Sequence, residues 1–263
     1  MEKVNIARDS TMANCASIVL NSYKLHKITH FNRIFFEWLL SALGVQELLI
    51  WWADQSAASL YGVEHLCADD ALRAPAIRSG KALRDWRVSR ALLHHVRVAR
   101  PLPGATSLSH SGGHALLATA RPGWKVGIDL EAIRPRSVEG LAQWVCSQAE
   151  RDMLAALPED ARLLRFYQLW TLKEAFIKAA GLDFPADMAL VGLQASPSGL
   201  ALRSPRGSWG ACSYRAGADW MASVVWQSPD GSAVDGLEPA WVGAAGCALP
   251  VVEMLGRWRT ETA

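Results

Sequence analysis

The segment Trp124-Lys-Val-Gly-Ile-Asp-Leu-Glu131 carries most of what the sequence says about the fold. Apolar residues alternate with other residues from Val126 to Glu131, which is the period of a β-strand. Asp129 and Glu131 are two positions apart, so their side chains project from the same face of that strand. The sequence therefore predicts a strand that presents two carboxylates side by side.

A second segment, Trp170-Thr-Leu-Lys-Glu-Ala-Phe-Ile-Lys178, predicts a helix. Apolar residues at Leu172, Phe176 and Ala179 follow helical spacing. Gly181 follows shortly after them, and glycine is a typical residue at the C-terminal end of a helix. We therefore expect a helix with an apolar face that ends at this glycine.

Glu174 and Lys178 lie four positions apart on this helix and therefore share a face. Together with Asp129 and Glu131 of the strand, Glu174 would form an oxygen-rich site suited to Mg²⁺, with substrate phosphates as further ligands. The lysine, one helical turn away, can meet the phosphate charge. Each piece alone has a plainer interpretation, as a solvated strand end or a weak surface ion pair. The order and spacing of the pieces favour the site.

Two further motifs surround the first segment. Leu108-Ser-His-Ser-Gly112 precedes it, and Trp144-Val-Cys-Ser-Gln-Ala-Glu150 follows it. In this order and spacing the four motifs resemble those of the 4′-phosphopantetheinyl transferases, specifically the surfactin-synthetase-activating type, over roughly residues 105–190. The resemblance implies an α+β fold of two similar α/β halves related by a pseudo-twofold, residues 45–122 and 123–263, with the active site at the interface between them.

The resemblance also implies an activity. The enzyme would transfer 4′-phosphopantetheine from coenzyme A to a serine of an apo acyl or peptidyl carrier protein and release 3′,5′-ADP. It implies Mg²⁺, or Mn²⁺ in its place, held by Asp129, Glu131 and Glu174. Because a serine hydroxyl is a poor nucleophile at neutral pH, a base is needed. Glu174 is the candidate base, with Glu131 as the alternative, and Lys178 would contact the phosphates and balance the charge on the leaving group.

The coenzyme-binding side chains follow partly from the resemblance and partly from a departure from it. The family's Gly-Lys/Arg-Pro loop is missing between residues 98 and 107. Arg84, Arg90 and Arg100 are therefore candidates for the 3′-phosphate contact, since a guanidinium suits a phosphate. For these arginines and for Lys173, a solvated helix face is the alternative. We expect these side chains to contact the coenzyme: Ser109, His110, Lys173, Lys178, Arg84 and Arg90.

Two other functions fit part of the pattern. A non-catalytic module that binds coenzyme A or a carrier protein would be indicated by the loss of an acid, and none of the three is lost. Another Mg²⁺-dependent transferase that cleaves a pyrophosphate would share the acids but not the Ser-His-Ser motif. The carrier could belong to fatty acid, polyketide or nonribosomal peptide synthesis. Trp144, Val145 and Met153 would either offer it an apolar patch or belong to the core.

Composition bounds the class of protein. The net charge of +2 gives no reason to expect a nucleic-acid partner, and no apolar run is long enough to span a membrane. Five scattered cysteines without a CxxC pair are typical of reduced thiols in the cytoplasm. We therefore expect a cytoplasmic monomer whose partners are coenzyme A and a carrier protein, with no nucleic acid and no membrane.

The first 44 residues differ in composition from the rest, because they hold all four asparagines of the chain. We interpret residues 1–44 as an N-terminal extension that is disordered or an artefact of the assigned start, and we favour the artefact; a helix around 33–43 that packs on the core is the alternative. Beyond it the patterns predict helices over 81–98, 138–157 and 163–180, and strands over 47–53, 115–120 and 220–226.

Overall fold

The computed structural model describes residues 48–99, 104–197, 199–204, 207–230 and 236–261. The N-terminal extension predicted for residues 1–44 lies outside the described residues, so its interpretation stays a prediction. Within the described ranges, no helix is both long enough and apolar enough to cross a membrane.

The first half of the described chain begins with the strand predicted over 47–53 and contains the long helix predicted over 81–98. In chain order its elements are β1 (Leu48–Ala53), the short 3₁₀ segments η1 (Gln55–Leu60) and η2 (Val63–His65), α3 (Ala68–Arg73), η3 (Ala74–Ala76), α4 (Gly80–Ala99), β2 (Ala105–Ser111) and β3 (His114–Ala120).

The second half begins with the strand that carries the paired carboxylates. Its elements are β4 (Lys125–Ala132), α5 (Val138–Val145), α6 (Gln148–Ala155), α7 (Glu159–Ala180), η4 (Met188–Leu190), β5 (Gly192–Ser196), β6 (Gly199–Arg203), β7 (Gly210–Ala216), β8 (Trp220–Gln227), β9 (Ala240–Gly243) and β10 (Val252–Arg259).

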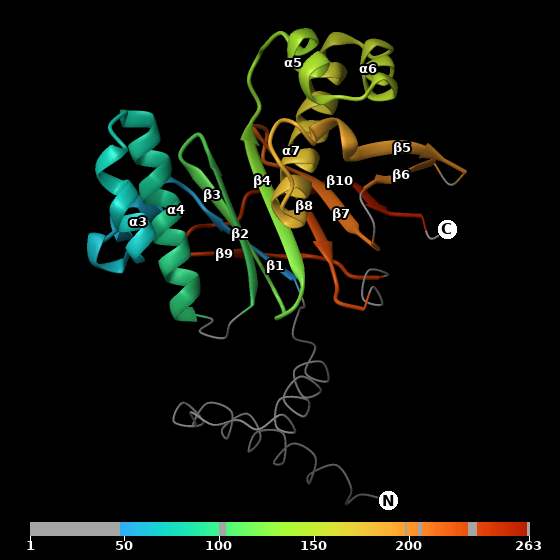
Figure 1. Cartoon of the computed structure of the whole chain (residues 1–263). Coiled ribbons are helices and arrows are strands. Elements are labelled where there is room, and N and C mark those ends of the chain that lie inside the picture. Colours follow the sequence, from blue (N-terminus) through green and yellow to red (C-terminus); the bar gives the residue numbers. More distant parts are fainter. Residues whose placement is uncertain (1–47, 100–103, 198, 205–206, 231–235, 262–263) are drawn as a thin grey trace, which may run out of the picture. The chain divides into compact units, whose positions relative to one another are not determined.

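The two halves repeat one topology. The first half runs β1-α4-β2-β3 and its strands pair antiparallel in the order β2-β3-β1. The second half runs β4-α7-β7-β8 and its strands pair antiparallel in the matching order β7-β8-β4. In Figure 1, α4 lies beside the first sheet and α7 lies against the second. This repetition confirms the prediction of an α+β fold with two similar α/β halves.

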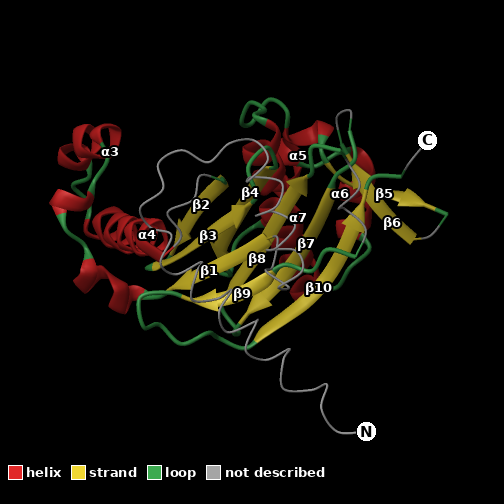
Figure 2. Ribbon diagram, turned by 90° about the horizontal axis from the view of Figure 1, so that it is seen from below, coloured by secondary structure: helices red, strands yellow, loops and turns green. Residues whose placement is uncertain are grey.

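Two late strands extend these sheets. β9 pairs parallel with β1, and β10 pairs antiparallel with β7, so the C-terminal part of the chain contributes to both sheets. Figure 2 shows the strands of the two sheets running side by side, with the edge strands β2 and β4 next to each other. One apolar core is common to the halves, since Leu116 of β3, Ile128 of β4 and Val224 of β8 belong to the same buried cluster.

The helix predicted over 138–157 is wrong in one respect, because the structure has two helices there. Ser147 is extended, its Oγ accepts a hydrogen bond from the Glu150 N–H, and the Glu150 carboxylate accepts one from the Ser147 N–H. This reciprocal capping box starts α6 as a new helix after α5 has ended at Val145. The predicted end of α7 is confirmed, since Gly181 adopts a left-handed conformation with φ of 65°.

Candidate functional site

The candidate site depends on a close approach between α7 and β4 that only a glycine permits. A Cβ on Gly127 would lie 1.9 Å from the carbonyl oxygen of Ala175 and 2.7 Å from the backbone nitrogen of Ala179. Any side chain at position 127 would therefore force the helix away from the strand. The glycine of the Gly-Ile-Asp-Leu-Glu segment lets the α7 backbone rest directly on β4, and this brings Lys178 within reach of Asp129.

Asp129 is the centre of the contacts between strand and helix. Its carboxylate is 4% exposed, and its Oδ1 accepts hydrogen bonds from Lys178 Nζ at 2.7 Å and from Ser109 Oγ at 2.8 Å. Lys178 Nζ also donates to the carbonyl oxygen of Ile128 at 3.1 Å. The second oxygen, Oδ2, is buried and has no hydrogen-bond partner among the described residues. A buried carboxylate oxygen without a donor is a position that a cation would stabilise.

The three predicted acids influence one another through their charges. Burial, and next the charge of Asp129, raises the pKa of Glu174 to about 7. Burial, and next the charge of Asp129, also raises the pKa of Glu131, against a hydrogen bond from Ser111. In the described chain no three His, Cys, Asp or Glu side chains are gathered in a metal-holding arrangement. The acids nevertheless lie close enough for the charge of Asp129 to act on Glu131 and Glu174, and this repulsion and the unpartnered Asp129 Oδ2 fit a hard cation.

Ser109 is not available to the coenzyme in the way the sequence suggested. The side chain is buried, and its one hydroxyl proton is donated to Asp129. A serine hydroxyl has a single donor, so in this arrangement it cannot donate to a phosphate. Ser111, which the sequence analysis did not select, donates in the same way to Glu131 Oε2 at 3.1 Å. In this arrangement the partner of the Ser109 hydroxyl is a carboxylate, and its contact with the coenzyme stays a prediction.

His110 points away from the acids, because it lies between Ser109 and Ser111 on a strand with alternating faces. Its imidazole lines a cavity of about 440 Å³ bounded by α3, η3, α4 and β2. Neighbouring groups exclude water from the imidazole ring. This desolvation lowers the pKa of His110, although the charge of Asp85 opposes the shift. The residues that line the cavity are Arg73, Ile77, Ser79, Lys81, Ala82, Asp85, Trp86, Arg90 and His110.

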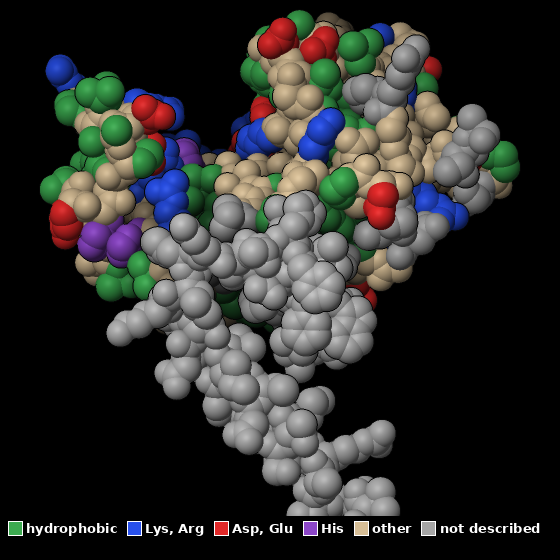
Figure 3. Space-filling view, turned by 60° about the horizontal axis from the view of Figure 1, so that its bottom comes forward, with side chains coloured by type: hydrophobic (Ala, Val, Ile, Leu, Met, Phe, Trp, Pro, Cys, Tyr) green, Lys and Arg blue, Asp and Glu red, His purple; other side chains and the backbone are tan. Residues whose placement is uncertain are grey.

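The cationic residues of this cavity differ from those predicted. Arg90 lines it, but its Nε lies 2.8 Å from Asp70 Oδ2, so much of its charge is balanced inside the protein. Arg84 is exposed and is not part of the lining. Arg73 and Lys81 complete the basic lining and were not selected from the sequence. Figure 3 shows the described surface hollowed between the α3–α4 region and the α5–α6 region, with basic side chains along the hollow.

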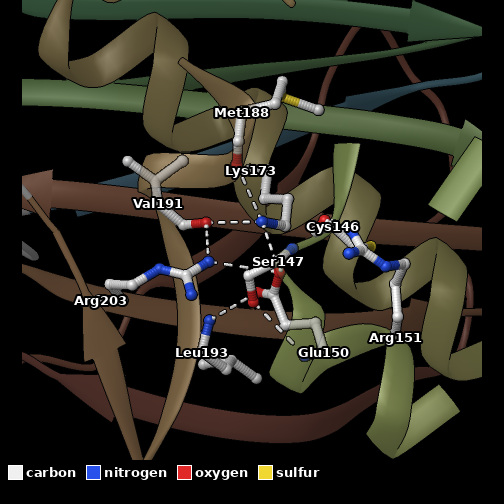
Figure 4. Close-up of polar contacts among 9 residues, drawn as sticks. All are labelled: Cys146, Ser147, Glu150, Arg151, Lys173, Met188, Val191, Leu193 and Arg203. Carbon is white, nitrogen blue, oxygen red and sulfur yellow. Dashed lines mark hydrogen bonds and ion pairs between the residues drawn. The ribbon is translucent and has the colours of Figure 1, made fainter. Parts of the chain in front are cut away.

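Lys173 was predicted to assist a phosphate, and the structure contradicts this. Its side chain is completely buried, and Nζ lies 2.8 Å from Glu150 Oε2 while donating to the carbonyl oxygens of Met188 at 2.9 Å and Val191 at 2.6 Å (Figure 4). An ammonium group has three donors, and these three acceptors use all of them. The alternative of a solvated helix face is equally wrong.

Glu150 completes this buried network, which Figure 4 shows between α6, α7 and the β5–β6 hairpin. Besides Lys173, its carboxylate accepts from the Leu193 N–H at 3.1 Å and lies 3.3 Å from Arg203 Nη2. Both oxygens of Glu150 therefore have donors. The network therefore joins α6, α7 and the β5–β6 hairpin, and it leaves neither Lys173 nor Glu150 to act on a substrate.

A comparison with known families now gives the site its context. The model of the 4′-phosphopantetheinyl transferase superfamily matches residues 125–225, a range that contains Asp129, Glu131, Glu174 and Lys178. Over these residues the chain is similar to the 4′-phosphopantetheinyl transferase superfamily. Ser109, His110 and the basic cavity precede the matched range.

Relatives that carry the name 4′-phosphopantetheinyl transferase match stretches of 76 to 112 residues. The 4′-phosphopantetheinyl transferase AcpT of Escherichia coli K12 is 35% identical over 112 residues, which cover 36% of this chain and 57% of the relative. HetI of a Nostoc species is 41% identical over 76 residues, covering 28% and 32%. Sfp of Bacillus subtilis is 38% identical over 84 residues, covering 31% and 36%, in agreement with the predicted type. The matched stretches span between about a third and somewhat over half of these relatives.

Among solved structures, a holo-(acyl-carrier-protein) synthase from Bacillus anthracis in complex with CoA (3′,5′-ADP) is similar with a TM-score of 0.32 and 14% identity. That match covers 39% of this chain and 93% of the other. The similarity of this part of the chain to the superfamily rests on the sequence matches.

Proposed function

We propose that this protein transfers the 4′-phosphopantetheine group of coenzyme A to a serine hydroxyl of an apo carrier protein and releases 3′,5′-ADP. The observation that carries the proposal is the placement of Glu174 and Lys178 of α7 against Asp129 of β4, within the segment that matches the superfamily model. The relatives that match this segment are themselves named 4′-phosphopantetheinyl transferases, which supports the same activity here.

Coenzyme binding is assigned to the cavity beside His110. Arg73 and Lys81 offer cationic donors to the phosphates of the nucleotide. Arg90 adds the guanidinium N–H groups that its pairing with Asp70 does not use. His110 lines the same cavity, so its imidazole can donate to a phosphate of the nucleotide. This set replaces Arg84 of the sequence prediction.

Proton transfer is assigned to Glu174. A pKa of about 7 allows its carboxylate to accept a proton at neutral pH and to hold it. The serine oxygen forms a bond to the β-phosphorus, the bond from that phosphorus to the bridging oxygen of the α-phosphate breaks, and the serine proton passes to the carboxylate. Glu131, whose pKa burial also raises, stays the alternative base.

Lys178 is assigned to the leaving group. Among the described residues its ammonium has two acceptors, Asp129 Oδ1 and the Ile128 carbonyl, so its third donor can face a phosphate oxygen. With 31% of the side chain exposed, it can approach the substrate without leaving Asp129. Its charge would balance the negative charge that develops on the departing 3′,5′-ADP.

The residues that would hold Mg²⁺, or Mn²⁺ in its place, are Asp129 through Oδ2, with Glu131 and Glu174 beside it. When bound, such a cation supplies positive charge that stabilises the diphosphate as its charge shifts. A carboxylate that ligates tightly cannot also act as a free base, so the proton passes to whichever of Glu131 and Glu174 does not ligate the cation.

The test is a transfer assay with a panel of apo acyl, polyketide and peptidyl carriers, each incubated with coenzyme A and Mg²⁺. We expect at least one carrier to gain the mass of one phosphopantetheine, to lose this gain in excess chelator, and to recover it with Mg²⁺ or Mn²⁺. Coenzyme A binding without a mass gain on any carrier would indicate a non-catalytic binding module instead. We also propose a cytoplasmic monomer, which cell fractionation and gel filtration test.

A further inference from the structure

The edges of the two sheets meet at β2 and β4, and side chains rather than backbone pairs join them. Among the described residues, β2 and β4 belong to different sheets, yet they lie next to each other (Figure 2). The hydroxyl oxygens of Ser107, Ser109 and Ser111 accept the backbone N–H groups of residues 128, 130 and 132 at 3.0, 3.2 and 3.1 Å. We call these three residues the serine ladder. It satisfies edge donors of β4 that would otherwise be left unpaired.

Two members of the serine ladder make a second contact that the third does not make. Ser109 Oγ donates to Asp129 Oδ1 at 2.8 Å, and Ser111 Oγ donates to Glu131 Oε2 at 3.1 Å. Ser107 makes the same backbone contact two residues earlier on β2. The matching position on β4 is Gly127, which has no side chain to accept a hydrogen bond. The ladder therefore matches the Gly-x-Asp-x-Glu pattern of β4 residue for residue.

The ladder fixes the direction of each donated proton. Because the Oγ accepts a backbone N–H from β4, its own single proton turns away from that donor and toward the carboxylate. Asp129 then has both Ser109 and Lys178 on Oδ1, which turns its other oxygen, Oδ2, toward the position without a donor.

We propose that Ser109 and Ser111 are positioning residues, which hold the carboxylates of Asp129 and Glu131 in the orientation that binds the divalent cation. The inference deepens the proposed function, because the cation is the one that the proposed transfer needs. Hydrogen bonds from groups behind metal ligands orient those ligands, and their loss typically weakens metal affinity by roughly 10–100-fold.

The experiment measures Mn²⁺ affinity of the full chain without coenzyme A, by electron paramagnetic resonance, for wild type and single variants. Ser109→Ala and Ser111→Ala should weaken Mn²⁺ binding by roughly 10–100-fold. Ser107→Ala is the matched control, because it removes the same kind of ladder hydrogen bond but no contact to a carboxylate. It should bind Mn²⁺ within about twofold of wild type. Ser109→Thr, which keeps the hydroxyl, should recover most of the affinity lost in Ser109→Ala.

Three results would overturn the inference. Equal weakening by Ser107→Ala and Ser109→Ala would mean that the ladder acts only through sheet geometry. Unchanged Mn²⁺ affinity in Ser109→Ala with a raised KM for coenzyme A would mean that the hydroxyl contacts a coenzyme phosphate instead of positioning Asp129. A wild type that binds no Mn²⁺ would remove the cation from the site. If Ser109→Ala does not fold, Ser111→Ala, at a half-buried position, decides in its place.

The inference and the proposed function can fail separately. If wild type transfers nothing to any carrier but binds Mn²⁺ in a way that depends on Ser109 and not on Ser107, the positioning role stands and the proposed activity falls. If transfer occurs and the three alanine variants bind Mn²⁺ alike, the activity stands and the positioning role falls.

Discussion

Two lysine–carboxylate pairs on the same helix have nearly equal geometry and different surroundings. Lys178 Nζ lies 2.7 Å from Asp129, and Lys173 Nζ lies 2.8 Å from Glu150. The lysines are five positions apart, which places them roughly 140° apart around α7. One therefore faces β4, and the other faces α6 and the β5–β6 hairpin. The distances alone do not tell the two pairs apart.

Their remaining hydrogen bonds do separate them. Lys173 has three acceptors and Glu150 has donors on both oxygens, so that pair is complete within the protein. Asp129 keeps a buried oxygen without a donor, and Lys178 has two acceptors and a partly exposed side chain. A complete buried pair can stabilise the fold but has nothing to offer a substrate. An incomplete pair costs stability and leaves groups for a ligand.

The largest expected effect comes from a variant beside the incomplete Lys178–Asp129 pair. Glu174→Gln removes the proposed base while keeping the shape of the side chain, so transfer should fall by roughly 10²–10⁴-fold. The free energy of unfolding should hold or rise, because the variant removes a charge that burial, and next the repulsion with Asp129, disfavours. Transfer kinetics and urea unfolding of the same preparation check both parts, and near wild-type turnover would remove Glu174 from the mechanism.

The complete region should respond in the opposite way. Glu150→Gln leaves the buried Lys173 ammonium without its counter-charge and should lower the free energy of unfolding by about 3–5 kcal/mol. The double variant Glu150→Gln with Lys173→Met should recover part of this loss, because no unpaired charge is then buried. Urea unfolding of both variants measures the difference. A single variant as stable as wild type would contradict the structural role of the network.

The basic cavity allows a sharper comparison between residues that line it and one that does not. Lys81→Ala and Arg73→Ala should each raise KM for coenzyme A by about tenfold with little change in kcat, since each removes a charged hydrogen bond made before chemistry. Arg84→Ala is the control, because Arg84 is exposed and outside the lining. A larger KM change in the control than in Lys81→Ala would show that the coenzyme lies elsewhere.

The smallest expected effect is a pH dependence of stability in the presence of a chelator. The pKa of Glu174 rises from an ordinary value of 4.5 to about 7 on folding, so between these values the folded protein holds a proton that the unfolded chain has lost. Stability that is present below pH 4.5 is therefore lost as the pH rises through about 7. Allowing for partial exposure, we expect a loss of about 1 kcal/mol. Urea unfolding across this range should show a flatter profile in Glu174→Gln, and an equal slope in both proteins would exclude Glu174 as its source.

The sequence located the incomplete pair well because two simple periodicities decide it. Period two places Asp129 and Glu131 on one face of a strand, and four-residue spacing places Glu174 and Lys178 on one face of a helix. Motif order then indicates that strand and helix meet. Gly127 explains how closely they meet, which no pattern of side chains could give.

The sequence failed where a partner lies far along the chain. Lys173 is next to Glu174, and nothing local distinguishes a solvated lysine from one buried against Glu150. The cavity residue Arg73 depends on how α3 and η3 pack beside α4, which leaves no periodic signal. Two signals were present but not used. The Ser147…Glu150 capping box marks the break between α5 and α6, and serines at 107, 109 and 111 repeat the period of β4.

The most direct measurement of the central claim compares Lys178→Met and Lys173→Met in parallel, by transfer rate at low temperature and by the free energy of unfolding. We expect Lys178→Met to lose roughly 10²–10³-fold in transfer while its stability changes by no more than about 1 kcal/mol. We expect Lys173→Met to lose about 3–5 kcal/mol of stability, while the fraction that remains folded transfers at nearly the wild-type rate. If Lys173→Met is as stable as wild type but inactive, or if Lys178→Met is unstable but active when folded, the distinction between the two pairs is wrong.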